Sequence, residues 1–124
     1  LMMQGEPWSA MASFRKAESL CAAAGDWVAV QNNIGFQSEA LCAMGNFEEA
    51  LATDRRREQI CREHAVVEGL VISLANQAQL QAEQFGQPEV GLSLATEALQ
   101  IARENAMAGL ASAIARIVAS IKDG

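Results

Sequence analysis

The strongest constraint on the fold of this chain is an internal repeat. Gly5, Gly45 and Gly86 follow one another at steps of 40 and 41 residues. A helix-start pattern comes after each glycine, either a proline at the expected first helical position or Asn46 followed by two acidic residues. Glycine is also the preferred residue for ending a helix in the left-handed conformation. Self-similarity at such a period is typical of stacked helical repeats, in which each unit packs on the next.

The segments between the glycines repeat at the same steps. Leu20, Ile60 and Ile101 occupy one repeat position, and segments 33–38 and 73–78 are 40 residues apart. Apolar or small residues recur at helical spacing between the turns. This pattern predicts about six helices, at 7–24, 26–44, 46–63, 66–85, 88–104 and 107–121. Turns are expected near Gly5, Gly25, Gly45, Ala65, Gly86 and Ala106, and such short turns make neighbouring helices antiparallel.

The composition agrees with an all-α fold and argues against several classes of protein. Aromatic residues make up only 5% of the chain, and alanine, leucine, glutamine and glutamate, which favour helices, recur throughout. No apolar run is long enough to span a bilayer. A net charge of -6 argues against binding to the phosphates of a nucleic acid. We therefore expect a cytoplasmic protein that binds neither membranes nor nucleic acids.

The cysteines and the single histidine do not form a recognisable catalytic or metal site. Cys21, Cys42 and Cys61 are odd in number and widely spaced, and only His64 could join them at a zinc ion. We expect reduced thiols and a solvated histidine near a helix C-terminus. The sequence has no glycine-rich phosphate loop and no paired-carboxylate site. It predicts no enzyme, no catalytic residue, no metal and no cofactor.

These repeats resemble the tetratricopeptide repeat family, and the period of 40 to 41 residues is similar to the long variety found in kinesin light chains and bacterial repeat proteins. Gly45, Phe47 and Ala50 match the family's glycine, aromatic and alanine positions. Two residues depart from the family pattern, since Asp54 replaces an aromatic or aliphatic residue and Arg57 replaces an alanine. The resemblance implies a right-handed superhelix, or α-solenoid, of stacked antiparallel helix pairs. It also implies a concave groove that binds peptides or protein segments.

The repeat predicts one domain over residues 1–124, with units at about 1–25, 26–65 and 66–106 and a final helix at 107–121. We expect this domain to be a segment of a longer array. Apolar residues cover more than one stripe of the final helix, namely Leu110, Ile114, Ile117, Val118 and Ile121. Leaving several such side chains in water is unfavourable. We therefore expect flanking repeats or a second copy of the chain to cover this helix.

The groove implied by the resemblance would be lined by the first helix of each pair. On that basis the candidate partner-binding residues are Asn32, Phe36, Glu39, Asn76, Gln79, Glu83 and Arg116. The amide side chains could form hydrogen bonds with a peptide backbone, and Phe36 could anchor a side chain. A polar surface that faces only solvent is the alternative.

The densest cluster of charges is Asp54, Arg55, Arg56 and Arg57. It could hold an acidic segment or a phosphate. The alternative is a solvated helix face with internal ion pairs, Asp54 with Arg57 and Glu58 with Arg62. Asp54 and Arg57 nevertheless align with inward apolar or small residues of the other repeats. We therefore expect both to face a neighbouring helix and to have polar partners there, because a buried charge without a partner is costly.

The expected function is that of a protein–protein interaction scaffold whose partner is a protein or a peptide. Two other classes remain open. One is a ligand-sensing regulatory domain of a larger signalling ATPase or transcription regulator. The other is a self-assembly module that forms a homo-oligomer through its end helices.

Overall fold

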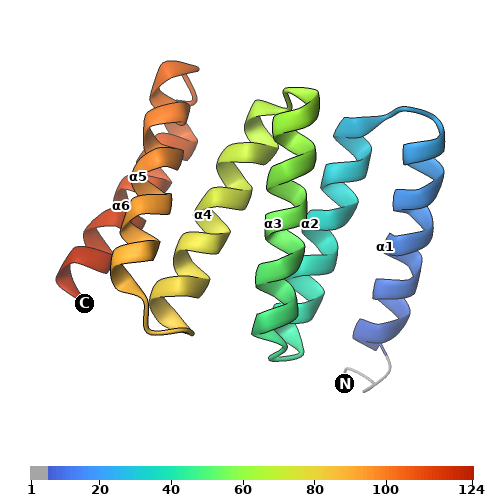
Figure 1. The fold of residues 1–124 in the computed structure, drawn as a ribbon, viewed down its shortest axis with the longest axis horizontal. Coiled ribbons are helices and arrows are strands. Elements are labelled where there is room, and N and C mark those ends of the chain that lie inside the picture. The colour runs from blue at the N-terminus through green and yellow to red at the C-terminus, as the bar shows by residue number, and fades with distance from the viewer. Residues whose placement is uncertain (1–5) are drawn as a thin grey trace. The chain divides into compact units, whose positions relative to one another are not determined.

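The computed structural model describes residues 6–124, with side chains from Trp8 onward. These residues form six α-helices and no β-strand (Figure 1). The helices are α1 (Glu6–Ala23), α2 (Trp27–Ala43), α3 (Phe47–His64), α4 (Val67–Glu83), α5 (Pro88–Glu104) and α6 (Ala108–Asp123). The all-α prediction is confirmed, with each helix within two residues of its predicted bounds. The turn predicted near Gly5 lies outside the described residues.

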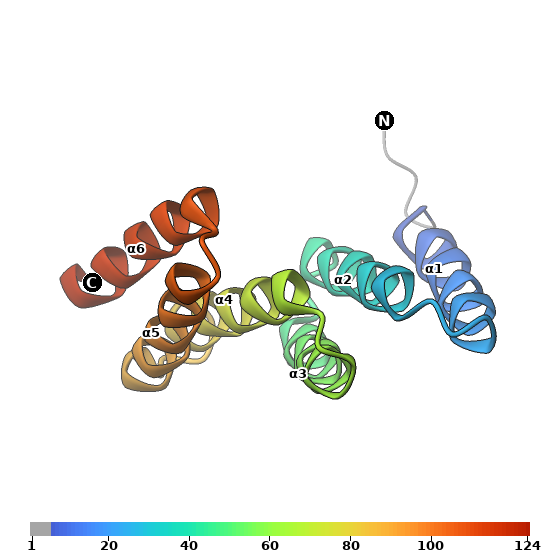
Figure 2. The same ribbon diagram turned by 90° about the horizontal axis from the view of Figure 1, so that it is seen from above.

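The chain divides into two compact units, one that extends to Gly69 and one from Leu70 to Gly124. In the N-terminal unit, α1, α2 and α3 pack in sequence, each antiparallel to the one before it (Figures 1 and 2). In the C-terminal unit, α5 packs against α6, and Gly91 of α5 lies against Ala78 and Ala82 of α4. Sequential packing of antiparallel neighbours is consistent with a helical repeat.

The turns between the helices explain the recurring glycines. Gly25, Gly45 and Gly86 have φ angles of 73°, 75° and 60°, a region that glycine adopts without strain. Ala65 and Ala106 occupy the same region, with φ of 56° and 55°. The five predicted turns within the described residues are thus confirmed. The two alanine turns are less favourable, because a Cβ approaches the following carbonyl in this conformation.

The helix starts follow the sequence pattern with one difference. Asp26 Oδ1 accepts a hydrogen bond of 3.1 Å from the backbone amide of Ala29 and so caps α2. Asn46 occupies the predicted N-cap position of α3, but its side chain does not cap the helix. Its Nδ2 donates instead to the Glu49 carboxylate at 2.8 Å.

Small residues let α4 and α5 approach closely in the C-terminal unit. A Cβ on Gly91 would lie only 2.7 Å from the Ala78 carbonyl oxygen and 3.1 Å from the Ala82 Cβ. The buried residues of α5 are Gly91, Ala95, Ala98 and Ala102. Larger buried side chains come from the neighbouring helices, for example Leu74 of α4 and Ile114 of α6. The backbones of α4 and α5 are therefore in contact at Gly91.

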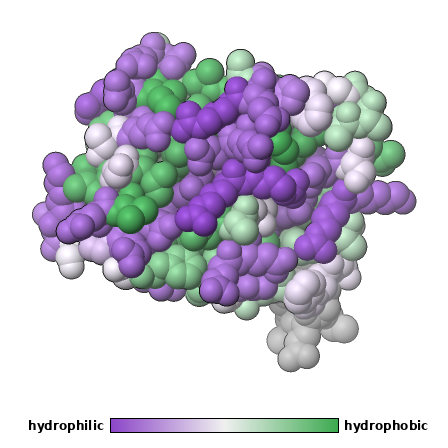
Figure 3. Space-filling view, in the orientation of Figure 1, coloured by the Kyte–Doolittle hydropathy of each residue, from purple (hydrophilic) through white to green (hydrophobic). Residues whose placement is uncertain are grey.

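The surface carries apolar side chains in several separate places. On the face drawn in Figure 3, hydrophilic residues predominate and hydrophobic residues form separate patches. Of the five apolar residues predicted to cover the final helix, only Ile114 is buried, at 1% exposure. Leu110, Ile117, Val118 and Ile121 are half-buried, so α6 retains accessible apolar area. None of the described helices has the length and hydropathy needed to cross a membrane.

Candidate functional site

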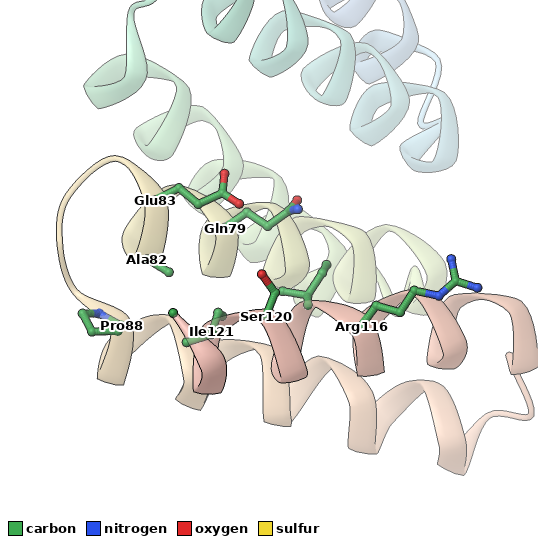
Figure 4. Close-up of a pocket in the computed structure, with 9 residues that line it drawn as sticks. Gln79, Ala82, Glu83, Pro88, Arg116, Ser120 and Ile121 are labelled. Atoms are coloured by element: carbon green, nitrogen blue, oxygen red, sulfur yellow. The ribbon is translucent and has the colours of Figure 1, made fainter.

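A groove in the C-terminal unit is formed by α4, the start of α5 and α6 (Figure 4). Its volume is about 480 Å³, which is within the range of ligand-binding pockets in proteins. The lining residues are Gln79, Ala82, Glu83, Pro88, Arg116, Ile117, Ser120, Ile121 and Gly124. Three of these, Gln79, Glu83 and Arg116, belong to the set predicted from the repeat.

Helical spacing explains how the polar residues reach this groove. Gln79 and Glu83 are four residues apart in α4, so they lie one turn apart on the same face. Arg116 and Ser120 have the same relationship in α6. Figure 4 shows Glu83 near the turn that leads to Pro88, and Arg116 at the opposite end of the groove.

The groove is lined both by polar side chains that have no partner among the described residues and by apolar side chains. Gln79, Glu83 and Arg116 are exposed, and within residues 6–124 their side chains form no hydrogen bond or ion pair. Glutamine offers a donor and an acceptor, glutamate only acceptors and arginine only donors. Ile117 and Ile121 supply apolar surface beside them. The groove can therefore bind a ligand that has both apolar and hydrogen-bonding groups.

The other four predicted groove residues lie elsewhere. Asn32, Phe36 and Glu39 are exposed residues of the N-terminal unit. The Phe36 ring contacts the Phe14 ring of α1, with centroids 5.3 Å apart, and remains 46% exposed. Asn76 of α4 is half-buried and is not among the residues that line the groove. The structure thus brings together three of the seven predicted residues in one groove.

The charged cluster at 54–57 is divided between two environments. Asp54 and Arg57 are buried, at 0% and 6% exposure, whereas the two arginines between them are exposed. Ser38 Oγ donates to Asp54 Oδ2 at 2.8 Å, and Arg57 Nε donates to Gln31 Oε1 at 2.8 Å. The predicted inward orientation is confirmed. The alternative of a solvated face is wrong for Asp54 and Arg57, although the predicted pair between Glu58 and Arg62 is present at 2.9 Å.

Two glycines make room for the buried polar side chains around Arg57. A Cβ on Gly35 would lie 2.8 Å from Arg57 Nη1, and a Cβ on Gly69 would overlap Gln31 Oε1 and lie 2.6 Å from Cys61 Sγ. Burial lowers the pKa of Arg57, against the opposing effects of Cys61 and of nearby carboxylates. These contacts lie inside the unit and favour a structural role for Arg57.

Arg56 links three helices in a way that the sequence analysis missed. Its Nη1 and Nη2 donate to the two carboxylate oxygens of Glu18 in α1 at 2.6 and 3.0 Å. Gln37 Nε2 of α2 donates to the same carboxylate at 2.8 Å. Burial raises the pKa of Glu18, but the bonds from Arg56 and Gln37 outweigh burial, and the pKa lies below its usual value. This cluster stabilises the packing of the N-terminal unit.

His64 is exposed at the end of α3, as predicted, but it also has an aromatic partner. Its ring stacks on Trp27 at the start of α2, with centroids 4.0 Å apart and planes 7° apart. Trp27 is half-buried. Cys61 Sγ lies 3.9 Å from Gln31 Oε1, and all three cysteines are free thiols. In the described part of the chain, no group of three or more metal-ligating side chains is suitable for an ion.

No protein-family model matches the chain. Comparison with curated proteins and with solved structures found no match either.

Proposed function

We propose that the chain is a tetratricopeptide-type helical repeat that binds a peptide or protein segment in the groove between α4 and α6. The observation that supports this function is that Gln79, Glu83 and Arg116 line the same groove. The family resemblance predicts all three as groove residues, and the groove that they line has a volume of about 480 Å³. Their polar groups have no partners within the described residues and are thus free to bind a ligand.

The chemistry of the groove suits a polypeptide ligand. A peptide backbone carries one donor and one acceptor per residue, and the Gln79 amide can pair with both. Ile117 and Ile121 provide an apolar surface for a side chain of the ligand. Because this groove is small, we expect it to hold only a few residues and to bind them weakly when acting alone. The three free thiols also favour the cytoplasm, where cysteines stay reduced.

Selection of peptides tests this function. A phage-displayed library of random short peptides would be selected on the full chain, and the selected peptides would be titrated by fluorescence anisotropy. We expect Gln79→Ala and Arg116→Ala to weaken binding about fivefold each. Arg55→Ala, an exposed arginine of the N-terminal unit, is the matched control and should have no effect. Failure to select any peptide that binds saturably would refute the proposal.

Self-association is a second candidate function, and it is favoured by the accessible apolar area of α6. Leu110 and Val118 are only half-buried, and a second copy of the chain could cover them. This function does not exclude peptide binding.

A further inference from the structure

We infer that the groove selects a protein segment in which one acidic and one basic residue flank an apolar side chain. This inference rests on the proposed peptide-binding function and specifies the chemistry of the ligand. It is carried by the placement of two opposite charges in one groove. Arg116 lies at one end, and Glu83 lies at the end where α4 turns toward Pro88 (Figure 4).

Both charges are available to a ligand. Glu83 and Arg116 are exposed, and neither forms an ion pair within residues 6–124. Pairing each with an opposite charge therefore breaks no existing bond. An exposed ion pair changes an equilibrium by up to about fivefold, and a like-charge contact acts in the reverse direction. The two charges together give selectivity between ligands of different charge pattern more than they give affinity.

Apolar surface separates the two charges along α6. Ile117 and Ile121 line the groove beyond Arg116, and five residues of helix cover about 7.5 Å. The long Arg116 side chain extends away from the Glu83 end, which lengthens the span between the charges (Figure 4). In an extended peptide, alternate residues point to one face and are about 6.7 Å apart. Residues i, i+2 and i+4 can therefore present a charge, an apolar group and the opposite charge.

Selections on charge-swapped variants test the inference. Phage-displayed random peptides would be selected in low salt, where exposed charges are least screened, on the wild type, Arg116→Glu, Glu83→Lys and the double variant. The wild type and the double variant should select peptides with one acid and one base around an apolar residue. Arg116→Glu should select two bases, and Glu83→Lys should select two acids.

Titration of the peptides that each protein selects gives the size of the effect. We expect each single variant to bind the wild-type peptide about tenfold more weakly than the wild type does, because one of the two contacts then joins like charges. The double variant should bind a peptide in which the acid and the base are exchanged about as tightly as the wild type binds its own peptide. Arg55→Glu, which reverses an exposed charge of the N-terminal unit, is the control and should select the wild-type pattern. Circular dichroism would verify that every variant remains helical.

The possible outcomes separate this inference from the function on which it rests. If the wild type selects no peptide, the peptide-binding function itself fails. If it selects peptides whose charge pattern is random, or whose pattern is the same for all four proteins, the function stands and the inference is overturned.

Discussion

The Arg57 guanidinium lies across Gly35 of α2, so closely that a Cβ on the glycine would come within 2.8 Å of Nη1. Arg57 is a long charged residue at a repeat position where the resemblance leads one to expect alanine. The absence of a side chain at Gly35 compensates for that length. The long Arg57 side chain fits at this position because Gly35 has no side chain.

This pairing predicts a coupling between two substitutions. Gly35→Ala should lower the free energy of unfolding by about 1–2 kcal/mol, because the buried guanidinium must move off its bond to Gln31. In an Arg57→Ala background, the same change should instead raise it by about 0.5–1 kcal/mol through helix propensity. Urea denaturation of the wild type, Gly35→Ala, Arg57→Ala and the double variant gives the coupling free energy between the two positions.

Gly109→Ala is the matched control for that experiment. Gly109 also lies in a helix, but a Cβ there would meet nothing within 4 Å. The substitution should be neutral or stabilising by several tenths of a kcal/mol in either background. If Gly35→Ala changed the free energy of unfolding equally in the wild type and in Arg57→Ala, the contact between the two residues would not contribute to stability.

The two alanine turns predict stabilising substitutions. Ala65→Gly and Ala106→Gly should each raise the free energy of unfolding by about 0.5–1 kcal/mol, because both alanines have positive φ. Gly25→Ala should lower it by a similar amount, since a Cβ there meets no atom within 4 Å and only the backbone is strained. Thermal and urea denaturation would measure all three. A destabilising Ala65→Gly would contradict the left-handed turn.

The Glu18 cluster predicts a pH-dependent contribution to stability. The pKa of Glu18 is lowered in the folded state, so its stabilisation is fully present above the unfolded-state pKa of about 4.3. It is lost as pH falls through the lower folded-state pKa. At pH 7, Glu18→Gln should cost about 0.5–1 kcal/mol, and the difference from wild type should shrink below about pH 4.

The exposed residue Glu48 provides the control for Glu18. Glu48→Gln should cost less than Glu18→Gln, because Glu48 has only an exposed, solvent-screened interaction with the N-terminus of α3. If the difference between wild type and Glu18→Gln grew on acidification, the assigned bonds to Arg56 and Gln37 would be wrong.

The accessible apolar area of α6 predicts self-association. Sedimentation velocity over a range of concentrations should show a reversible increase in mass, and Val118→Glu should abolish it by placing a charge in the contact. Ala113→Glu adds the same charge at an exposed position on another face of the same helix and serves as the control. A wild type that stays monomeric at every concentration would exclude this mode of assembly.

The helices and turns could be predicted because their determinants are local. A glycine or alanine at each turn and apolar residues at helical spacing place the boundaries within two residues. The inward orientation of Asp54 and Arg57 followed from alignment of the repeats, because equivalent positions face equivalent neighbours.

The contacts between distant residues could not be predicted in the same way. Arg56 meets Glu18 from 38 residues away, and His64 meets Trp27 across an antiparallel pair of helices. Such contacts depend on the rotation and rotamers of side chains in packed helices, which no local pattern determines. For the same reason, the sequence predicts Gln79, Arg116 and Asn76 alike as groove residues, although only the first two line the groove.

The width of the groove is controlled by a residue that does not line it. Gly91 lies one helical turn beyond Pro88, and its contact with Ala78 holds α5 directly against α4. Any side chain at position 91 would push these helices apart and move one wall of the groove relative to the other. Ligand preference could therefore change, in evolution or by design, through a substitution at a site the ligand does not touch.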